Sequence, residues 1–166
     1  RKIRSLSVSE IGIGCMGFSH GYGQVPDAGY AEEAIREAFG YGCNFFDTAG
    51  GYGKELYYPG HNEEIVGRAV KGYRNEVVIA TKLHIRPEMV EDCGSVYAAV
   101  CRHLERSLKN LQTGYVDLYY LHRINMEVDY LEVAHAMGRL IQEGLVREWG
   151  ISAVDKAQLE AAHAVT

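Results

Sequence analysis

The sequence predicts an α/β fold in which five β-strands alternate with helices and run parallel to one another. Short apolar runs alternate with amphipathic stretches along the 166 residues, and successive runs begin roughly 30 residues apart. Such alternation is typical of parallel strands that are covered by helices. With 47% hydrophobic and 23% charged residues, the composition is that of one globular domain, residues 1–166.

The first two β-α units begin with the most glycine-rich part of the chain. EIGIGCM, residues 10–16, is expected to be the first strand, and YAEEAIREAFGYG, residues 30–42, an amphipathic helix. CNFFDT, residues 43–48, is the second expected strand. The helix of NEEIVGRAVKGY, residues 62–73, is predicted to use Asn62 as its N-cap, because Asn accepts hydrogen bonds from a first helical turn.

The third and fourth strands flank the longest helix. EVVIATK, residues 76–82, is rich in β-branched residues, which favour strands. In SVYAAVCRHLERSLKNLQTG, residues 95–114, apolar residues recur on one helical face. YVDLYYLH, residues 115–122, is the fourth expected strand.

The last segment repeats the pattern once more and begins a further helix. YLEVAHAMGRLIQEG, residues 130–144, is a helical pattern that ends at a glycine, as helices often do. LVREWGIS, residues 145–152, is the fifth strand, and DKAQLEAAHAVT, residues 155–166, begins the fifth helix.

Three glycines near the N-terminus raise an alternative fold. Gly12, Gly14 and Gly17 spell G-x-G-x-x-G, the fingerprint of a dinucleotide-binding Rossmann unit. That unit requires its third glycine at the opening of a helix. Here a glycine-rich loop containing Pro26 follows, and the helix begins only near Gly29. The context disfavours a Rossmann unit, and the glycines instead let the backbone at a strand end approach a ligand.

Polar side chains follow four consecutive expected strands. The second strand ends at Asp47 with Tyr52 shortly after it, the third at Lys82, the fourth at His122 and the fifth at Ser152. Taken singly, each has an ordinary structural explanation, such as a turn cap, a packed tyrosine or a core histidine. Barrel enzymes place their active sites at the C-terminal ends of the strands, so the repetition favours a site.

The first four of these residues permit a specific chemistry. A lysine ammonium about 4 Å from a phenolate, at an effective dielectric constant of about 20, stabilises it by up to about 4 kcal/mol. Asp47, Lys82 and Tyr52 therefore make a plausible proton donor, and His122 can polarise a carbonyl oxygen. The set contains no source of electrons, so a nicotinamide cofactor would complete it.

Five segments resemble the aldo-keto reductase family, in the family's order: VSEIGIGCMGFSHGYG, FFDTAGGYG, VVIATK, VDLYYLHR and GLVREWGIS. The resemblance implies a (β/α)8 TIM barrel, of which this chain would hold about five units, with the sixth to eighth units absent. It further implies NADP(H)-dependent reduction of a small aldehyde or ketone to an alcohol.

The resemblance also implies a role for each site residue. Tyr52 would be the general acid, tuned by Asp47 and Lys82, and His122 would orient the carbonyl, so that Tyr52 and His122 both contact substrate. The residues that would approach the cofactor are Met16, Gly17, Asp47 and Ser152. Two segments depart from the family pattern: GKELYYPGH, which lengthens the link after Tyr52, and Ala153, where many members have Asn or Glu.

The expected barrel is incomplete, because eight units typically need about 250 residues. We expect either a longer native protein, or association with a second copy or a complementary half that covers the open sheet edges. The family's later strands would supply a ring that stacks on nicotinamide and a loop that binds the adenosine 2'-phosphate. A preference for NADPH over NADH therefore rests on the resemblance alone.

Composition argues against several other classes of protein. A net charge of −5 disfavours nucleic-acid binding, and no apolar run is long enough to span a membrane. The N-terminal residues lack the pattern of a signal peptide. The four cysteines form no C-x-x-C pair and suit small buried side chains in a reducing cytoplasm.

Two alternative functions remain open at this stage. One is a non-catalytic relative that binds the cofactor as a regulatory subunit. The other is metal-assisted hydrolysis through His20, Asp47 and His122, although their spacing is irregular. The natural substrate is not evident from the sequence; the aromatic candidates for the mouth of the site are His20, Tyr22, Tyr57 and Tyr58.

Overall fold

A parallel sheet of five strands organises the computed structural model, which describes residues 1–21 and 23–166, so that Tyr22 lies outside it. The strands lie side by side in sequence order, as in a segment of a barrel, whereas a Rossmann sheet reverses its order. The expected fold class is therefore confirmed. The strands are β3 (Ile13–Gly14), β4 (Phe45–Asp47), β5 (Val78–Leu83), β6 (Val116–Leu121) and β7 (Val146–Ile151).

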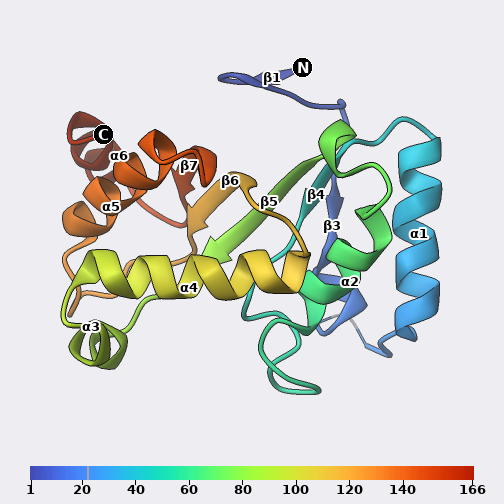
Figure 1. The fold of residues 1–166 in the computed structure, drawn as a ribbon, viewed down its shortest axis with the longest axis horizontal. Coiled ribbons are helices and arrows are strands. Elements are labelled where there is room, and N and C mark those ends of the chain that lie inside the picture. The colour runs from blue at the N-terminus through green and yellow to red at the C-terminus, as the bar shows by residue number, and fades with distance from the viewer. Residues whose placement is uncertain (22) are drawn as a thin grey trace.

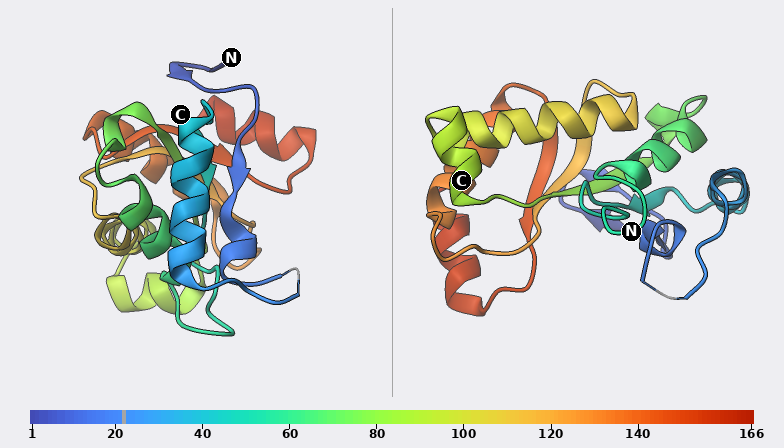
Figure 2. Two further views of the ribbon diagram at one scale, coloured as in Figure 1. Left: turned by 90° about the vertical axis from the view of Figure 1, so that its right-hand side faces the viewer. Right: turned by 90° about the horizontal axis from the view of Figure 1, so that it is seen from below.

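The helices lie on one side of the sheet (Figures 1 and 2), and all but α6, which follows the last strand, connect successive strands. In the right-hand view of Figure 2 they follow an arc outside the curved sheet. Apolar side chains from the outer sheet face and from the helices form the larger core cluster. The main helices are α1 (Ala28–Gly40), α2 (His61–Val70), α4 (Val96–Leu111), α5 (Tyr130–Gln142) and α6 (Lys156–Ala164).

An N-terminal hairpin, which the sequence did not predict, covers one end of the inner sheet face. Its strands β1 (Lys2–Ile3) and β2 (Leu6–Ser7) are antiparallel. Leu6 packs with Val78 and Leu118 in a second, smaller apolar cluster. The Glu148 carboxylate on β7 accepts hydrogen bonds from the Ser5 amide and hydroxyl, which fastens the hairpin to the far strand.

Three short helical segments also went unpredicted. The 3-10 turn η1 (Cys15–Phe18) replaces the end of the expected first strand, so β3 is only two residues long. A second 3-10 turn, η2 (Arg74–Glu76), precedes β5, and helix α3 (Pro87–Cys93) follows it. Pro87 at the start of α3 and Gly94 at its end are the ordinary signals for a short helix.

The predicted N-cap of α2 is wrong. The helix begins at His61, and its N-cap is Gly60, whose φ of 95° is accessible to glycine but unfavourable for other residues. Asn62 lies inside the first turn and is fully buried, with its side chain bonded to other segments. The amide of Asn62 therefore serves tertiary structure rather than the helix terminus.

A buried ion pair ties strands β5, β6 and β7 together at the end opposite the expected site. Asp117 on β6 is fully buried and accepts a hydrogen bond from the Ile79 amide on β5 at 3.0 Å. Its carboxylate also contacts Arg74 at 2.8 Å and Arg147 of β7 at 3.1 Å. Two cations and one amide thus compensate a charge that would otherwise be costly to bury.

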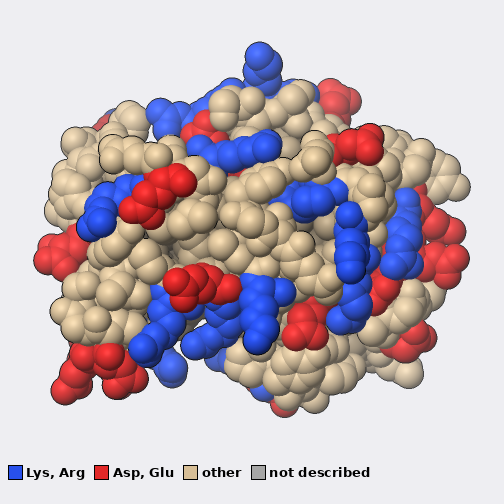
Figure 3. All heavy atoms as spheres, in the orientation of Figure 1, with Lys and Arg blue, Asp and Glu red and all other residues tan. Residues whose placement is uncertain are grey.

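The surface carries both signs of charge. Figure 3 shows acidic and basic side chains interspersed on one face, with a group of Lys and Arg side chains at the lower border near α4. Among the described residues, none of the helices combines the length and the apolar character that crossing a membrane requires.

Candidate active site

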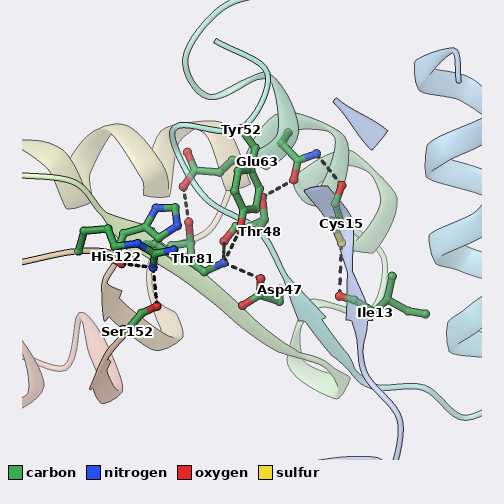
Figure 4. A network of polar contacts seen from close by, with 12 residues as sticks. Ile13, Cys15, Asp47, Thr48, Tyr52, Glu63, Thr81, His122 and Ser152 are labelled. Atoms are coloured by element: carbon green, nitrogen blue, oxygen red, sulfur yellow. Dashed lines mark hydrogen bonds and ion pairs between the residues drawn. The ribbon is translucent and has the colours of Figure 1, made fainter. Parts of the chain in front are cut away.

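Successive side chains of a strand point to opposite faces of the sheet, and this decides which face each predicted site residue occupies. Phe45, Val78 and Leu118 face the inner apolar cluster. Side chains two residues apart share a sheet face, so Asp47 and Lys82 point inward near the ends of β4 and β5. His122 continues this inner row directly after β6, and the close-up in Figure 4 shows it on the same side as Asp47 and Tyr52.

The Lys82 ammonium is the centre of the site. It donates to Asp47 Oδ1 at 2.5 Å, to the Thr48 carbonyl at 2.8 Å and to Tyr52 Oη at 3.1 Å (Figure 4). The Lys82 side chain is only 10% exposed, whereas that of Asp47 is 33% exposed. Three residues that the sequence places up to 35 positions apart thus form one hydrogen-bonded unit.

The His122 imidazole stands beside this unit. Its ring meets the Tyr52 ring edge-on, with centroids 5.9 Å apart. Burial and, to a smaller extent, the nearby charges of Lys82 and Arg123 together lower the pKa of His122 to about 4. At neutral pH the imidazole is therefore uncharged, so one ring nitrogen donates a hydrogen bond and the other accepts one.

Ser152 lies directly after β7 and joins the site through an arginine. Its hydroxyl accepts a hydrogen bond from Arg123 Nη1 at 2.9 Å, and the same nitrogen donates to the His122 carbonyl at 2.7 Å. The segment VDLYYLHR contains Arg123, but the sequence alone indicates no role for this residue. No pattern in the sequence indicates that its guanidinium would bridge the ends of two strands.

Met16 and Gly17 lie in the η1 turn, at the same end of the sheet as the other site residues. Neither contacts the Lys82 unit directly. The link is indirect: the Asn62 amide donates to the carbonyl of Cys15 at 2.9 Å and accepts from the Thr48 hydroxyl at 2.6 Å. Sequence reasoning missed this role of Asn62, because an Asn at the start of a helix is ordinarily an N-cap.

A family model supplies the comparison that identifies the chain. The model described as the aldo/keto reductase family matches residues 10–166. This chain belongs to the aldo/keto reductase family.

Individual aldo-keto reductases agree with this assignment. The chain is 34% identical over 167 residues to a probable aldo-keto reductase 1 of Glycine max, and 35% identical over 156 residues to an uncharacterized oxidoreductase, YqkF, of Bacillus subtilis. These matches cover 98% and 90% of this chain but 46% of each relative. The chain thus spans about half the length of these curated relatives.

Solved aldo-keto reductase structures have the same arrangement of elements. One from Klebsiella pneumoniae, in complex with NADPH, matches with a TM-score of 0.74 and 33% identity. The glycerol dehydrogenase AKR11B4 of Gluconobacter oxydans matches with a TM-score of 0.77 and 28% identity. The matches cover 93% and 96% of this chain, and 49% of each solved chain.

The aromatic candidates for the mouth fall into two groups. The His20 ring lies beside Tyr52, with centroids 5.8 Å apart, and faces the exposed Glu55 at 3.8 Å. Tyr57 and Tyr58 are about half exposed and pack on the His61 ring at the start of α2. Of the four candidates, only His20 is seen to contact the expected proton donor, and Tyr22 lies outside the described residues.

A metal site would require several ligating side chains close together. Across residues 1–21 and 23–166, no group of three or more His, Cys, Asp or Glu residues is arranged to hold a metal ion. Cys15 is fully buried, and burial raises the pKa of its thiol, so it behaves as a small apolar residue. The polar groups at the strand ends instead make an ammonium–phenol–imidazole arrangement that can deliver a proton to an oxygen atom.

Proposed function

We propose that this chain carries the active-site residues of an NADP(H)-dependent reductase that converts an aldehyde or a ketone to the alcohol. One observation carries the proposal: the Lys82 ammonium contacts Tyr52 Oη at 3.1 Å and Asp47 Oδ1 at 2.5 Å. Membership of the aldo/keto reductase family supports oxidoreduction in general, and the Klebsiella relative is in complex with NADPH.

Each residue has a defined part in the proposed reaction. The uncharged His122 imidazole donates a hydrogen bond to the carbonyl oxygen and so polarises the carbonyl group. Tyr52 transfers its phenolic proton to the same oxygen, and the Lys82 ammonium stabilises the phenolate that remains. The nicotinamide, when bound, supplies the hydride to the carbonyl carbon, so one hydride and one proton complete the alcohol.

The described residues fit the nicotinamide end of the cofactor. An ideal Cβ built on Gly14 meets no other atom within 4 Å, so the end of β3 offers open space. Asp47 at the end of β4 and Ser152 directly after β7 are partly exposed, as are Met16 and Gly17 in η1. We propose that these four residues hold the carboxamide and its ring. No residue of this chain is proposed for the adenosine 2'-phosphate.

The test replaces the proton donor and a matched tyrosine. Tyr52→Phe should lower kcat for NADPH-dependent reduction of 4-nitrobenzaldehyde by a factor of about 100 to 10,000, because general acid catalysis is lost. Tyr41→Phe removes the hydroxyl of a surface tyrosine that is 91% exposed, and should leave the rate unchanged. A Tyr52→Phe variant as active as the control would refute the assignment.

The alternative role is a non-catalytic subunit that binds the cofactor. It would need only the residues expected to approach the cofactor, which are Met16, Gly17, Asp47 and Ser152, and no turnover of substrate. Quenching of the fluorescence of Trp149, the only tryptophan, reports NADP⁺ binding independently of turnover. Binding without turnover in the unsubstituted chain would support the alternative and contradict the reductase.

Association and location stay predictions. The sheet has two edges in the described part of the chain, β3 and β7, and each could pair with a second copy or with a complementary half. Size-exclusion chromatography with light scattering tests this, and a monomer that unfolds cooperatively would contradict it.

A cytoplasmic location is supported by four cysteines without a disulfide, and fractionation of expressing cells tests it.

A further inference from the structure

The buried side-chain amide of Asn62 joins two loops that lead into the site. Asn62 is fully buried, as are Thr48 and Ser19. Its Oδ1 accepts from the Thr48 hydroxyl at 2.6 Å, and its Nδ2 donates to the Cys15 carbonyl at 2.9 Å and to Ser19 Oγ at 2.7 Å. Both protons of the amide and its oxygen are thus used within the protein.

One branch of this network reaches the Lys82 ammonium. The backbone carbonyl of Thr48 accepts a hydrogen bond from Lys82 Nζ at 2.8 Å, while its hydroxyl binds Asn62. Thr48 also donates its amide to the Ala80 carbonyl of β5 at 2.8 Å. The position of Thr48 therefore affects the direction in which the ammonium is held.

The other branch reaches the η1 turn. The Cys15 carbonyl marks the first residue of η1, and Ser19 follows its last residue, so Asn62 binds the turn at both ends. Met16 and Gly17, the two residues expected to approach the cofactor, lie between these contacts. Within the turn, the amides of Ser19 and His20 both donate to the Met16 carbonyl at 3.0 Å.

A planar amide fixes the distance between its partners. Breaking a buried hydrogen bond leaves a polar group unsatisfied, which is unfavourable, so the arrangement has few alternatives. We propose that Asn62 is a positioning residue that couples the η1 turn to the Lys82 ammonium, and so aligns the proton donor with the cofactor. The effect of this alignment on catalysis rests on the proposed function. The coupling between the η1 turn and the Lys82 ammonium does not rest on it.

The same helix end provides a matched control. Thr81, also fully buried, donates its hydroxyl to Glu63 Oε1 at 2.6 Å, the same length as the bond from Thr48 to Asn62. Glu63 adjoins Asn62 in α2 but binds Asn110 of α4 rather than the η1 turn. Thr48→Val and Thr81→Val therefore remove equivalent hydroxyls, and only the first breaks the proposed coupling.

Hydrogen exchange in the full chain measures the coupling without any turnover. We would compare the exchange rates of the Lys82 ammonium and of the Ser19 and His20 amides, using ¹⁵N-labelled protein. Asn62→Ala should raise all three rates by about tenfold, because local opening becomes easier. Thr48→Val should raise the Ser19 and His20 rates as well, although the substitution lies outside the turn. Thr81→Val should leave the three rates within about twofold of wild type.

Two results would overturn the coupling. The first is an Asn62→Ala variant that folds and exchanges at the same rates as Thr81→Val. If Asn62→Ala does not fold, Thr48→Val decides, and unchanged rates at Ser19 and His20 in that variant are the second result. Far-UV circular dichroism and a urea melt establish that each variant is folded.

Kinetics then separate the coupling from the proposed function. In an active chain, Asn62→Ala should lower kcat by about 10- to 100-fold with little change in the KM of the carbonyl substrate, because misalignment affects the chemical step. A purely structural role would instead lower the amount of active protein and leave kcat per folded molecule unchanged. A wild-type chain without turnover contradicts the proposed function, and the exchange rates still decide the coupling.

Discussion

The partly buried imidazole of His103 should make this chain lose stability in acid. His103 lies on α4 behind the loop that carries Tyr52, and its Nδ1 is 2.9 Å from Tyr119 Oη. A Cβ added at Gly50 of that loop would be only 3.3 Å from His103 Cε1. Burial lowers the pKa of His103 to about 4, and the positive charge of Arg106 contributes in the same direction.

The sign and the size of the effect follow from proton linkage. The unfolded chain binds this proton at the ordinary histidine pKa of 6.5, whereas the folded chain binds it only near pH 4. The free energy of unfolding is therefore unaffected above about pH 6.5 and falls as the pH drops towards 4. At about pH 5 the loss attributable to His103 is about 2 kcal/mol.

Urea unfolding at about pH 7.5 and about pH 5 tests this. His103→Gln removes the titration but retains a group that can bind the Tyr119 hydroxyl. The matched control is His135→Gln, on the exposed face of α5. Wild type and the control should lose about 2 kcal/mol more than His103→Gln between the two pH values. If the free energy of unfolding of all three proteins falls by the same amount, the His103 imidazole is not the cause.

Three further predictions concern other parts of the molecule. Lys82→Met should lower kcat of an active chain by about 100-fold or more, whereas the exposed Lys71→Met should not, as steady-state kinetics will show. Asp117→Ala should lower the free energy of unfolding by about 3 kcal/mol, because two arginines lose their buried partner. Urea unfolding measures this loss, and the surface variant Glu160→Ala is the control. Ala153 has a φ of 57°, which is unfavourable for a residue with a Cβ. Ala153→Gly should therefore increase the free energy of unfolding by about 0.5–1 kcal/mol and raise the melting temperature.

The sequence was sufficient to predict the order of the units and which polar side chains gather at one end of the sheet. Largely apolar runs mark β5 and β6 clearly, because both faces of these strands are buried. Parallel strands expose their C-terminal ends on one edge, so Lys82 and His122 could be brought together without any knowledge of distances. The contact of Lys82 with Asp47 followed from the same argument.

Other features depend on tertiary contacts that leave no local pattern. The strands of the N-terminal hairpin are two residues long, too short for an alternation to be recognised, and their partners Val78 and Leu118 are distant in the sequence. Helix α3 has seven residues, less than two full turns of an amphipathic pattern. Asn62 was misassigned because its partners, Thr48 and Cys15, approach it only in the folded chain.

The geometry divides the candidate site into an inner part and an edge part. The inner part is the hydrogen-bonded unit of Lys82, which depends on β4 and β5, and each of these strands has a neighbour on both sides. The edge part is Ser152 with the exposed Arg123, and it follows β7, which has only β6 beside it in the described chain. Pairing of β7 with a further strand would therefore alter the contacts of Ser152 far more than those of Lys82. Conditions that change association of the chain should then affect cofactor binding while leaving the exchange rate of the Lys82 ammonium unchanged.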